Sequence, residues 1–447
     1  MPDVTLKSPT AAGHVVALFE RLEGQRSAEP AWLRTRRRNA MIAFEHLGFP
    51  TTRDEEWRFT NIKPIAGARF SPAPSVTAVS SQAAAGYLIP GIDGSVLTFV
   101  NGRFAPALSS LRPGVRLGSM AELLRSDATI LERHLGRYAS TADRAFVALN
   151  TALFEDGAVI DVEPDTVVGA PVQLVFLSAD NGTPIASHPR VLIVAGRNSQ
   201  VRVIESFGGV DGGARTFTNA VTEIVTEAGA VVEHYRLQRE RDESFHIGHT
   251  QFQLGRSSNS TSHAVSIGGL IARHEAVAVL ADEGVECTLN GLYLADGSRL
   301  VDNHTEIDHA MPHGGSHELY KGILAGQARA VFNGRIRVRP DAQKTDAKQT
   351  NKTLLLSDDA QINTKPQLEI LANDVKCTHG ATVGQLSEDA MFYLRARGIG
   401  ADEARGLLIR AFAIDVVNRM SLEPVRAELD RLLASWLPGA LAREVVA

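Results

Sequence analysis

The sequence predicts a mainly β protein, with a strand-rich core between an N-terminal and a C-terminal helical region. From Gly157 to Leu371 the chain is a long succession of short segments rich in Val, Ile and Thr. Before and after this stretch, apolar residues recur at helical spacing instead. Turn signals return along the core at intervals of about 26 to 42 residues, an imperfect repeat of the kind that a degenerate β-helix leaves. From the residues alone, a β-sandwich remains the alternative to the β-helix.

Length, composition and charge describe a globular chain with an ample core. Its 447 residues suffice for two or three domains, the formal charge is -5 and the pI is near 6.3. This balance gives no general attraction to nucleic acid or to an anionic membrane, so neither is expected as a partner. No apolar run approaches the roughly 20 residues that cross a bilayer, and no secretory signal pattern opens the chain. Because only two cysteines are present, we expect free thiols and a cytoplasmic location.

Residues 1–156 are expected to form a mainly helical region with an irregular insert. Apolar residues at helical spacing from Leu33 to Leu47, followed by Gly48, predict one helix and its end. Three consecutive arginines on this helix are interpreted as solvated or ion-paired, with an anionic partner as the alternative. They are Arg36, Arg37 and Arg38.

Three further segments of this region carry local signals. DEEWRF at 54–59 is interpreted either as a docking element or as a loop anchored to the core by its aromatic residues. SPAPSVTAVSSQAAAG at 71–86 is rich in small residues and proline, which predicts a linker or an irregular excursion. LTFVNGRF at 97–104 predicts a β-hairpin closed by an Asn-Gly turn.

Residues 157–384 are expected to form the β core. A sheet built of βαβ units is not expected, because no helical segment separates the strands. The imperfect repeat rests on turn signals at Arg197-Asn198, Ala228-Gly229, Gly255, Glu283-Gly284 and Gly326.

Histidines and carboxylates gather in one segment of the core, DNHTEIDHAMPHGGSHE. Both are legitimate ligands of zinc or iron. On a strand, however, His304 and Asp308 would share one face while His309 pointed to the other, and Pro312 would break the strand before His317. We interpret the group as hydrogen-bonded structural histidines and turn residues, with a metal site as the alternative. Its members are Asp302, His304, Glu306, Asp308, His309, His313 and His317.

Residues 385–447 return to helical spacing. Ser387 is the expected N-cap of a short helix that runs to about Arg397 and stops at Gly398. Two amphipathic helices follow, and helices of this kind most often pack on their own domain.

Cys377 and His379 form the candidate site. If the segment around them is extended, both side chains leave the same face of the strand, because the side-chain period is two. Thiolate and imidazole are ligands of first-row metals and iron-sulfur clusters, so the pair supplies two ligands of a site that normally needs four. The second cysteine, Cys287, is far away in sequence. Spacing alone favours a buried cysteine beside a structural histidine, with the metal or cluster site as the alternative.

Common enzyme motifs are missing from the chain. It has no G-x-x-x-x-G-K-[ST] phosphate loop and no G-x-S-x-G elbow, so nucleotide hydrolysis and hydrolase chemistry are not expected. Cys377 as nucleophile with His379 as base is an alternative, but their Cα atoms would lie roughly 6.5 Å apart on a strand. We expect a non-catalytic protein, with a cysteine-dependent or metal-dependent enzyme on a β-solenoid as the alternative.

The chain resembles the SufB/SufD family, whose members are subunits of the SufBCD iron-sulfur cluster assembly complex. The resemblance is carried by KTDAKQTNKTLLLSDDAQINTKPQLEI, DVKCTHGATVG and EDAMFYLRARGI between Lys344 and Gly400, and upstream by NHTEIDHAMPHGGSHELYKGIL, AVFNGRI and DEEWRFTNI. Ala360 stands where the SufB pattern has a cysteine, which favours the SufD branch. A SufB-like scaffold is the alternative.

This resemblance implies a right-handed parallel β-helix and a scaffold role in iron-sulfur cluster assembly. It implies a heterodimer with a SufB-like subunit, a SufC-like ATPase bound through the C-terminal helices, and a homodimer when the chain is alone. Cys377 and His379 would lie near the SufB–SufD interface as ligands of a transient cluster or iron shared with the partner. The isolated chain would hold no cluster stably. The helical ends would also cover strand edges that a solenoid exposes.

Overall fold

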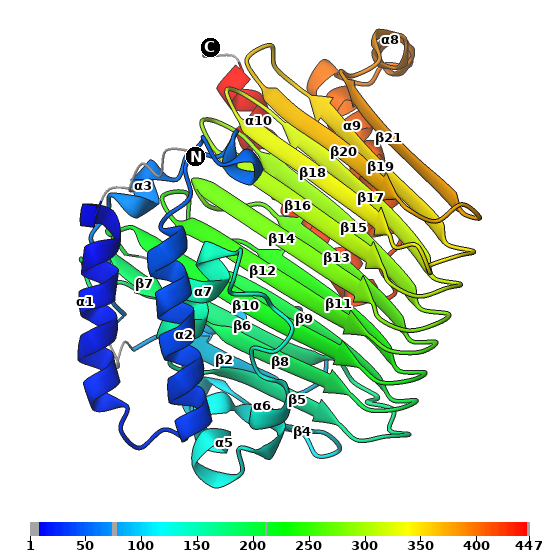
Figure 1. Ribbon diagram of the computed structural model, residues 1–447. Coiled ribbons are helices and arrows are strands. Elements are labelled where there is room, and N and C mark those ends of the chain that lie inside the picture. Colours follow the sequence, from blue (N-terminus) through cyan, green and yellow to red (C-terminus); the bar gives the residue numbers. More distant parts are fainter. Residues whose placement is uncertain (1–8, 74–77, 211, 445–447) are drawn as a thin grey trace, which may run out of the picture.

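Two sheets of mostly parallel strands form the body of the protein, and successive strands alternate between them (Figure 1). The computed structural model describes residues 9–73, 78–210 and 212–444. From β5 (Gly157–Val162) to β21 (Lys376–Gly384) the chain winds as a parallel β-solenoid of about eight turns. Beyond β9 (Gln200–Gly209), each strand pairs in parallel with the strand two positions later, as β10 (Thr216–Thr226) does with β12 (Phe245–Leu254). The expectation of a parallel β-helix is therefore confirmed, and the sandwich alternative is wrong.

Each sheet stacks one strand from every turn of the solenoid. Sheet A contains, in spatial order, β20 (Gln361–Ile370), β18 (Arg329–Val338), β16 (Leu300–His309), β14 (Ile271–Leu280), β12, β10, β8 (Arg190–Ala195), β5 and β4 (Arg116–Ser119), with β7 (Ile185–Ser187) joining β10 to β1 (Ser71–Pro72). Sheet B contains β21, β19 (Asp346–Leu355), β17 (Gly315–Leu324), β15 (Glu286–Ala295), β13 (Asn259–Ser266), β11 (Val231–Gln238), β9, β6 (Val172–Ser178), β2 (Val96–Val100) and β3 (Arg103–Phe104). Strands from before residue 157 thus extend both sheets.

The main apolar core lies between the sheets, where alternate residues of each strand point inward. It includes Phe176, Phe252, Tyr293, Tyr320 and Phe332, all buried. At one corner the turns stack on one another and place a residue in the left-handed conformation. These residues are Asn198, Gly229, Ser257, Gly284, His313 and Lys344. This stack accounts for the predicted turn signals at Asn198, Gly229, Gly255 and Gly284, whereas Gly326 lies at another corner, between β17 and β18 and beside Gly297.

The N-terminal helices cover part of the outer face of sheet A (Figure 1). Phe44 and Phe146 pack there against Phe217, Phe245 and Ile271. The helical segments are α1 (Pro9–Gln25), α2 (Ala31–Leu47), η1 (Glu55–Trp57), α3 (Lys63–Ala66), α4 (Ser81–Ala85), η2 (Pro106–Leu108), α5 (Met120–Ser126), α6 (Thr129–His134) and α7 (Ala145–Leu153).

Most local predictions for this region are confirmed. Helix α2 ends at Gly48, and the Asn101-Gly102 turn, with φ of 55° and 76°, joins the antiparallel pair β2–β3. The expected linker at 71–86 instead contains β1 and α4, and its residues 74–77 lie outside the described ranges. Arg37 is buried and paired with Glu29 at 2.9 Å rather than solvated.

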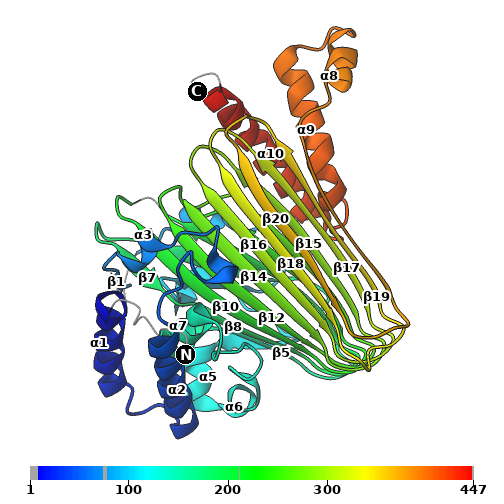
Figure 2. The ribbon, with the colours of Figure 1, turned by 45° about the horizontal axis from the view of Figure 1, so that its top comes forward.

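Three C-terminal helices follow the last strand: α8 (Glu388–Arg395), α9 (Ala401–Val417) and α10 (Glu423–Glu444). The hydroxyl of Ser387 caps α8 by accepting a hydrogen bond from Ala390 N at 3.3 Å, as predicted. Helices α9 and α10 pack through Ile409, Val416 and Leu429 on the outer face of sheet B. Figures 1 and 2 show α8 standing clear of the strands, at the far end of α9. Within the described ranges, no helix combines the length and the apolar character that spanning a membrane requires.

Candidate functional site

The last turn of the solenoid is open. Strands β20 and β21 are the edges of sheets A and B, and the described part of the chain pairs nothing with their outer sides. Ile370, Leu371 and Val383 are 39%, 54% and 45% exposed there. The expectation that the helical ends cover the edges is wrong at this end, because α9 and α10 lie on the outer face of sheet B instead. An unpaired edge with apolar surface is a template for another polypeptide.

Cys377 and His379 both lie on the edge strand β21. The parallel register places Cys377 opposite Ala347 and His379 opposite Gln349, two residues that are buried between the sheets. Cys377 is half-buried and packs against the inward-facing cluster that includes Ile336 and Val338, whereas His379 is exposed. Both ligand candidates therefore sit over the interior of the solenoid, at its open end.

The surroundings of the two cysteines favour the protonated thiol. Partial burial raises the pKa of Cys377, which works against a nucleophilic thiolate. Cys287 is 1% exposed, and burial raises its pKa to about 12. The register links Cys287 to Ser316, Ser316 to Ala347, and Ala347 to Cys377, so two strands separate the cysteines. Cys287 is therefore not a further ligand for a site at Cys377.

A buried polar column lies beneath His379, and sequence reasoning missed it. The register stacks His379 on Gln349 and Gln349 on Glu318. Gln349 Nε2 donates a hydrogen bond to Glu318 Oε2 at 2.8 Å, and the Thr305 hydroxyl donates to Glu318 Oε1. Burial raises the pKa of Glu318 to about 7. Only the parallel register reveals the column, because its members come from three successive turns.

The histidine-rich segment does not converge on one point. His309 is buried and hydrogen-bonded to Ser316 Oγ at 2.9 Å, His313 occupies a turn with φ of 59°, and His317 is exposed on β17. His304 joins a different network, with Asp302 and Glu56. Among the side chains that the structure describes, no group of three or more His, Cys, Asp or Glu residues is arranged to hold a metal ion.

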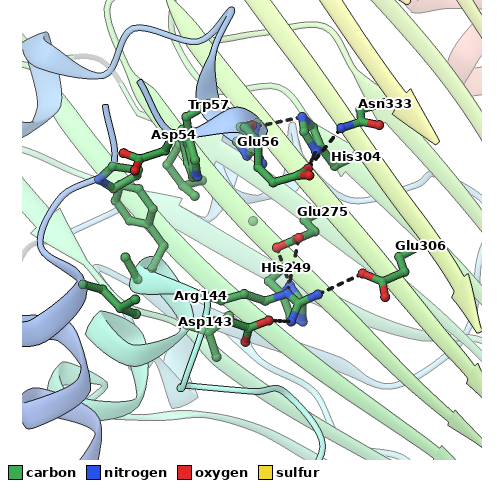
Figure 3. A pocket seen from close by; sticks show the side chains of 18 of the residues that line it. Asp54, Glu56, Trp57, Asp143, Arg144, His249, Glu275, His304, Glu306 and Asn333 are labelled. Atoms are coloured by element: carbon green, nitrogen blue, oxygen red, sulfur yellow. Dashed lines mark hydrogen bonds and ion pairs between the residues drawn. The ribbon is translucent and has the colours of Figure 1, made fainter. Parts of the chain in front are cut away.

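A cavity of about 480 Å³ lies where the DEEWRF segment meets the outer face of sheet A (Figure 3). Glu56 accepts hydrogen bonds there from His304 Nδ1 at 3.1 Å, Asn333 Nδ2 at 3.0 Å and Arg335 Nη2 at 3.0 Å. The ring of Trp57 stacks on the guanidinium of Arg273, with 3.9 Å between Cζ and the ring centroid. DEEWRF thus anchors the N-terminal region to the solenoid.

A second ion-pair network closes the other side of this cavity. Figure 3 shows Arg144 placed between Glu275 and Glu306, from which its nitrogens lie 3.3 and 3.1 Å. His249 Nδ1 lies 3.1 Å from Glu275 Oε2. The charges that line the cavity are therefore largely paired with one another.

Helix α8 presents a separate apolar surface. Phe392 and Tyr393 are 75% and 56% exposed, and Leu407 on α9 is 45% exposed. A groove beside them is lined by Met391, Phe392, Arg395, Ile399 and others.

The fold and the open end define a parallel β-solenoid with helices at both chain ends and a thiol–imidazole pair on its last strand. Comparison with known families agrees with this description. The model of the SufBD core domain of the SUF iron-sulfur cluster assembly system matches residues 176–412, and the model of the SufBD N-terminal region matches residues 14–174. The chain therefore belongs to the SufBD family.

Individual relatives match along nearly the whole chain. An iron-sulfur cluster assembly SufBD family protein of Synechocystis is 35% identical over 416 residues, covering 91% of each chain. The iron-sulfur cluster assembly protein SufD of Escherichia coli is 30% identical, covering 88% of this chain and 90% of that protein. Protein ABCI7, chloroplastic, of Arabidopsis thaliana is 30% identical, covering 92% of this chain and 88% of that protein. These findings confirm the SufD-like resemblance.

Proposed function

We propose that this protein is a non-catalytic scaffold subunit of an iron-sulfur cluster assembly complex. It pairs with a SufB-like homologue, and Cys377 and His379 contribute to a cluster or iron site shared across the interface. The cluster is cargo in this scheme, held transiently and passed on.

One observation carries the proposal: both ligand candidates lie on the edge strand β21, whose outer side pairs with no strand among the described residues, at the open end of the solenoid. A second solenoid placed end to end would pair with β20 and β21 and would cover the apolar residues exposed beside them. The same contact would bring ligands from the partner to Cys377 and His379. Two ligands from one chain are too few for a stable site, which is why the interface is needed.

The C-terminal helices are proposed to recruit a SufC-like ATPase. Exposed aromatic residues on a helix that stands clear of its own domain are the kind of anchors that protein interfaces use. The chain itself carries no phosphate loop, so nucleotide hydrolysis belongs to the partner. We propose a cytoplasmic location for the complex. For the chain alone, we propose a homodimer that forms through the open ends of two solenoids.

The test is substitution of the two ligand candidates in cells that lack this gene. His379→Ala is expected to abolish complementation, and Cys377→Ser to weaken it less, because serine keeps the size and a poorer donor. His317→Ala is the matched control, since His317 is also an exposed histidine on a strand of sheet B. Size-exclusion chromatography of the mutant complexes separates lost ligands from lost assembly. Full complementation by His379→Ala would overturn the proposal.

A SufB-like scaffold is the second candidate, because SufB and SufD belong to one family. Ala360, where the SufB pattern has a cysteine, argues for the SufD-like assignment. The raised pKa of Cys377 argues against a cysteine-dependent enzyme.

A further inference from the structure

The column beneath His379 contains an amide with an unused acceptor. Gln349 is 2% exposed and extends across the interior of the solenoid to Gly334 on sheet A, where a side chain would collide with its amide. Its Nε2 is engaged with Glu318. Its Oε1 is buried without a hydrogen-bond partner among the described residues. A buried acceptor without a partner is costly, so a nearby donor should be sought.

His379 is a donor that the strand register brings alongside Gln349. It is the residue directly opposite Gln349 on the next strand, and paired residues of adjacent parallel strands project the same way, about 4.8 Å apart. The His379 side chain is exposed on the open side of β21, so the surrounding chain leaves its ring room to turn. A hydrogen bond to Gln349 Oε1 requires the ring to turn so that one N–H faces the strand beneath it.

We propose that Gln349 is a positioning residue for His379, accepting the ring N–H through Oε1, and that Glu318 holds the Gln349 amide in the orientation that this requires. The inference deepens the proposed function and rests on it for its biological meaning. A neutral imidazole has one N–H donor and one lone pair, so a fixed N–H leaves the other nitrogen free toward iron. The two buried residues thus select the tautomer that binds the cargo.

The first experiment reads the tautomer of His379 in the purified chain. Histidine labelled with ¹⁵N and ¹³C reports which ring nitrogen carries the proton, and His379→Asn assigns the signals. At a pH where the ring is neutral, one tautomer is expected to dominate in the parent and a mixture in Gln349→Met. Asn351→Leu is the matched control, because Asn351 is also buried on the inward face of β19 but lies opposite Ala381.

A second variant controls for a folding defect in Gln349→Met. Gln349→Met leaves the Glu318 carboxyl with one partner fewer, whereas Gln349→Met combined with Glu318→Met removes both members of the hydrogen bond and keeps the volume. The double variant should fold and should show the same mixture of tautomers. An unchanged single tautomer in both variants would overturn the inference.

The second experiment separates this inference from the proposed function. In the complementation assay Gln349→Met is expected to lower activity by about 10-fold, as removal of a hydrogen-bond partner of a metal-ligating histidine does. If His379→Ala complements fully, the proposed function fails whatever the tautomer. If His379→Ala fails to complement while Gln349→Met leaves both tautomer and activity unchanged, only the role of Gln349 is rejected.

Discussion

The Glu56 carboxylate accepts a hydrogen bond from His304 Nδ1 at 3.1 Å, which joins residues 248 positions apart in the chain. The contact fastens the N-terminal region to sheet A. Burial and the guanidinium of Arg273 both disfavour a charged ring, but Asp302 and Glu56 outweigh them and raise the pKa of His304. His304 therefore has a structural role, because its ring is paired with Asp302 and Glu56.

Glu56→Ala should therefore loosen the N-terminal region. It removes the acceptor of three side-chain hydrogen bonds, but the carboxylate is 43% exposed, so we expect a loss of about 1–3 kcal/mol in the free energy of unfolding. Urea unfolding measures this loss, and limited proteolysis near residue 60 should accelerate. Glu55→Ala is the control, because Glu55 is exposed and pairs with Lys365. Equal effects of the two substitutions would contradict the prediction.

Glu223→Ala should be far more destabilising. Its carboxylate is buried, lies 2.5 Å from Arg190 Nη2 and accepts backbone hydrogen bonds from Gly136, Tyr138 and Ala139. Removing it leaves a buried guanidinium uncompensated, at about 3–5 kcal/mol. Asp93→Ala, which breaks an exposed pair with Arg112, should change stability by less than about 1 kcal/mol. Thermal unfolding of both variants checks the contrast.

Stability should also depend on pH through Glu318. Burial raises the pKa of this carboxyl from 4.5 to about 7, so the folded state binds the proton more tightly than the unfolded chain. The contribution of the protonated Glu318 carboxyl to the free energy of unfolding is therefore fully present below pH 4.5 and is lost as the pH rises to about 7. Glu318→Gln removes this dependence. The difference in the free energy of unfolding, variant minus parent, should therefore be larger at pH 8 than at pH 5 by on the order of 2 kcal/mol.

Urea unfolding at both pH values measures this gain. The exposed residue Glu286 on β15 provides the control, since Glu286→Gln should show no comparable change. A pH-independent difference between Glu318→Gln and the parent would contradict the raised pKa.

The exposed aromatic residues of α8 should be needed for binding the ATPase. Phe392→Ser combined with Tyr393→Ser should weaken capture of a SufC-like ATPase by 10-fold or more, because truncated anchors cost about 2 kcal/mol. Both side chains are mostly exposed, so the melting temperature should not change. Ile42→Ser is the control, since Ile42 is 63% exposed on α2. Undiminished capture by the double variant would reject the docking surface.

The isolated chain should acquire no stable cluster. Anaerobic reconstitution, followed by iron and sulfide analysis, should give far less than one cluster per chain, because Cys377 and His379 alone leave ligand positions unfilled. Adding the SufB-like partner should raise the yield. A stoichiometric cluster on the chain alone would show that no shared site is required.

Local signals in the sequence determined the elements of this protein. Apolar spacing marked the helix that ends at Gly48, an Asn-Gly pair marked the hairpin at Asn101, and Ser387 marked the start of α8. These signals act between neighbours in the chain, so they can be read without knowing the fold. The cysteine and the histidine of the candidate site were likewise visible by their chemistry and spacing.

Only the tertiary structure decided which residues surround Cys377 and His379. Strand pairing in a solenoid joins residues about thirty positions apart, and no local pattern states which strands are partners. The pairing left β21 as an open edge, stacked His379 on Gln349 and Glu318, and separated Cys287 from Cys377. It also drew His304 toward Glu56 and away from the histidines beside it in sequence. Side-chain environments depend on this long-range register, because the residues that share an inward face come from different turns.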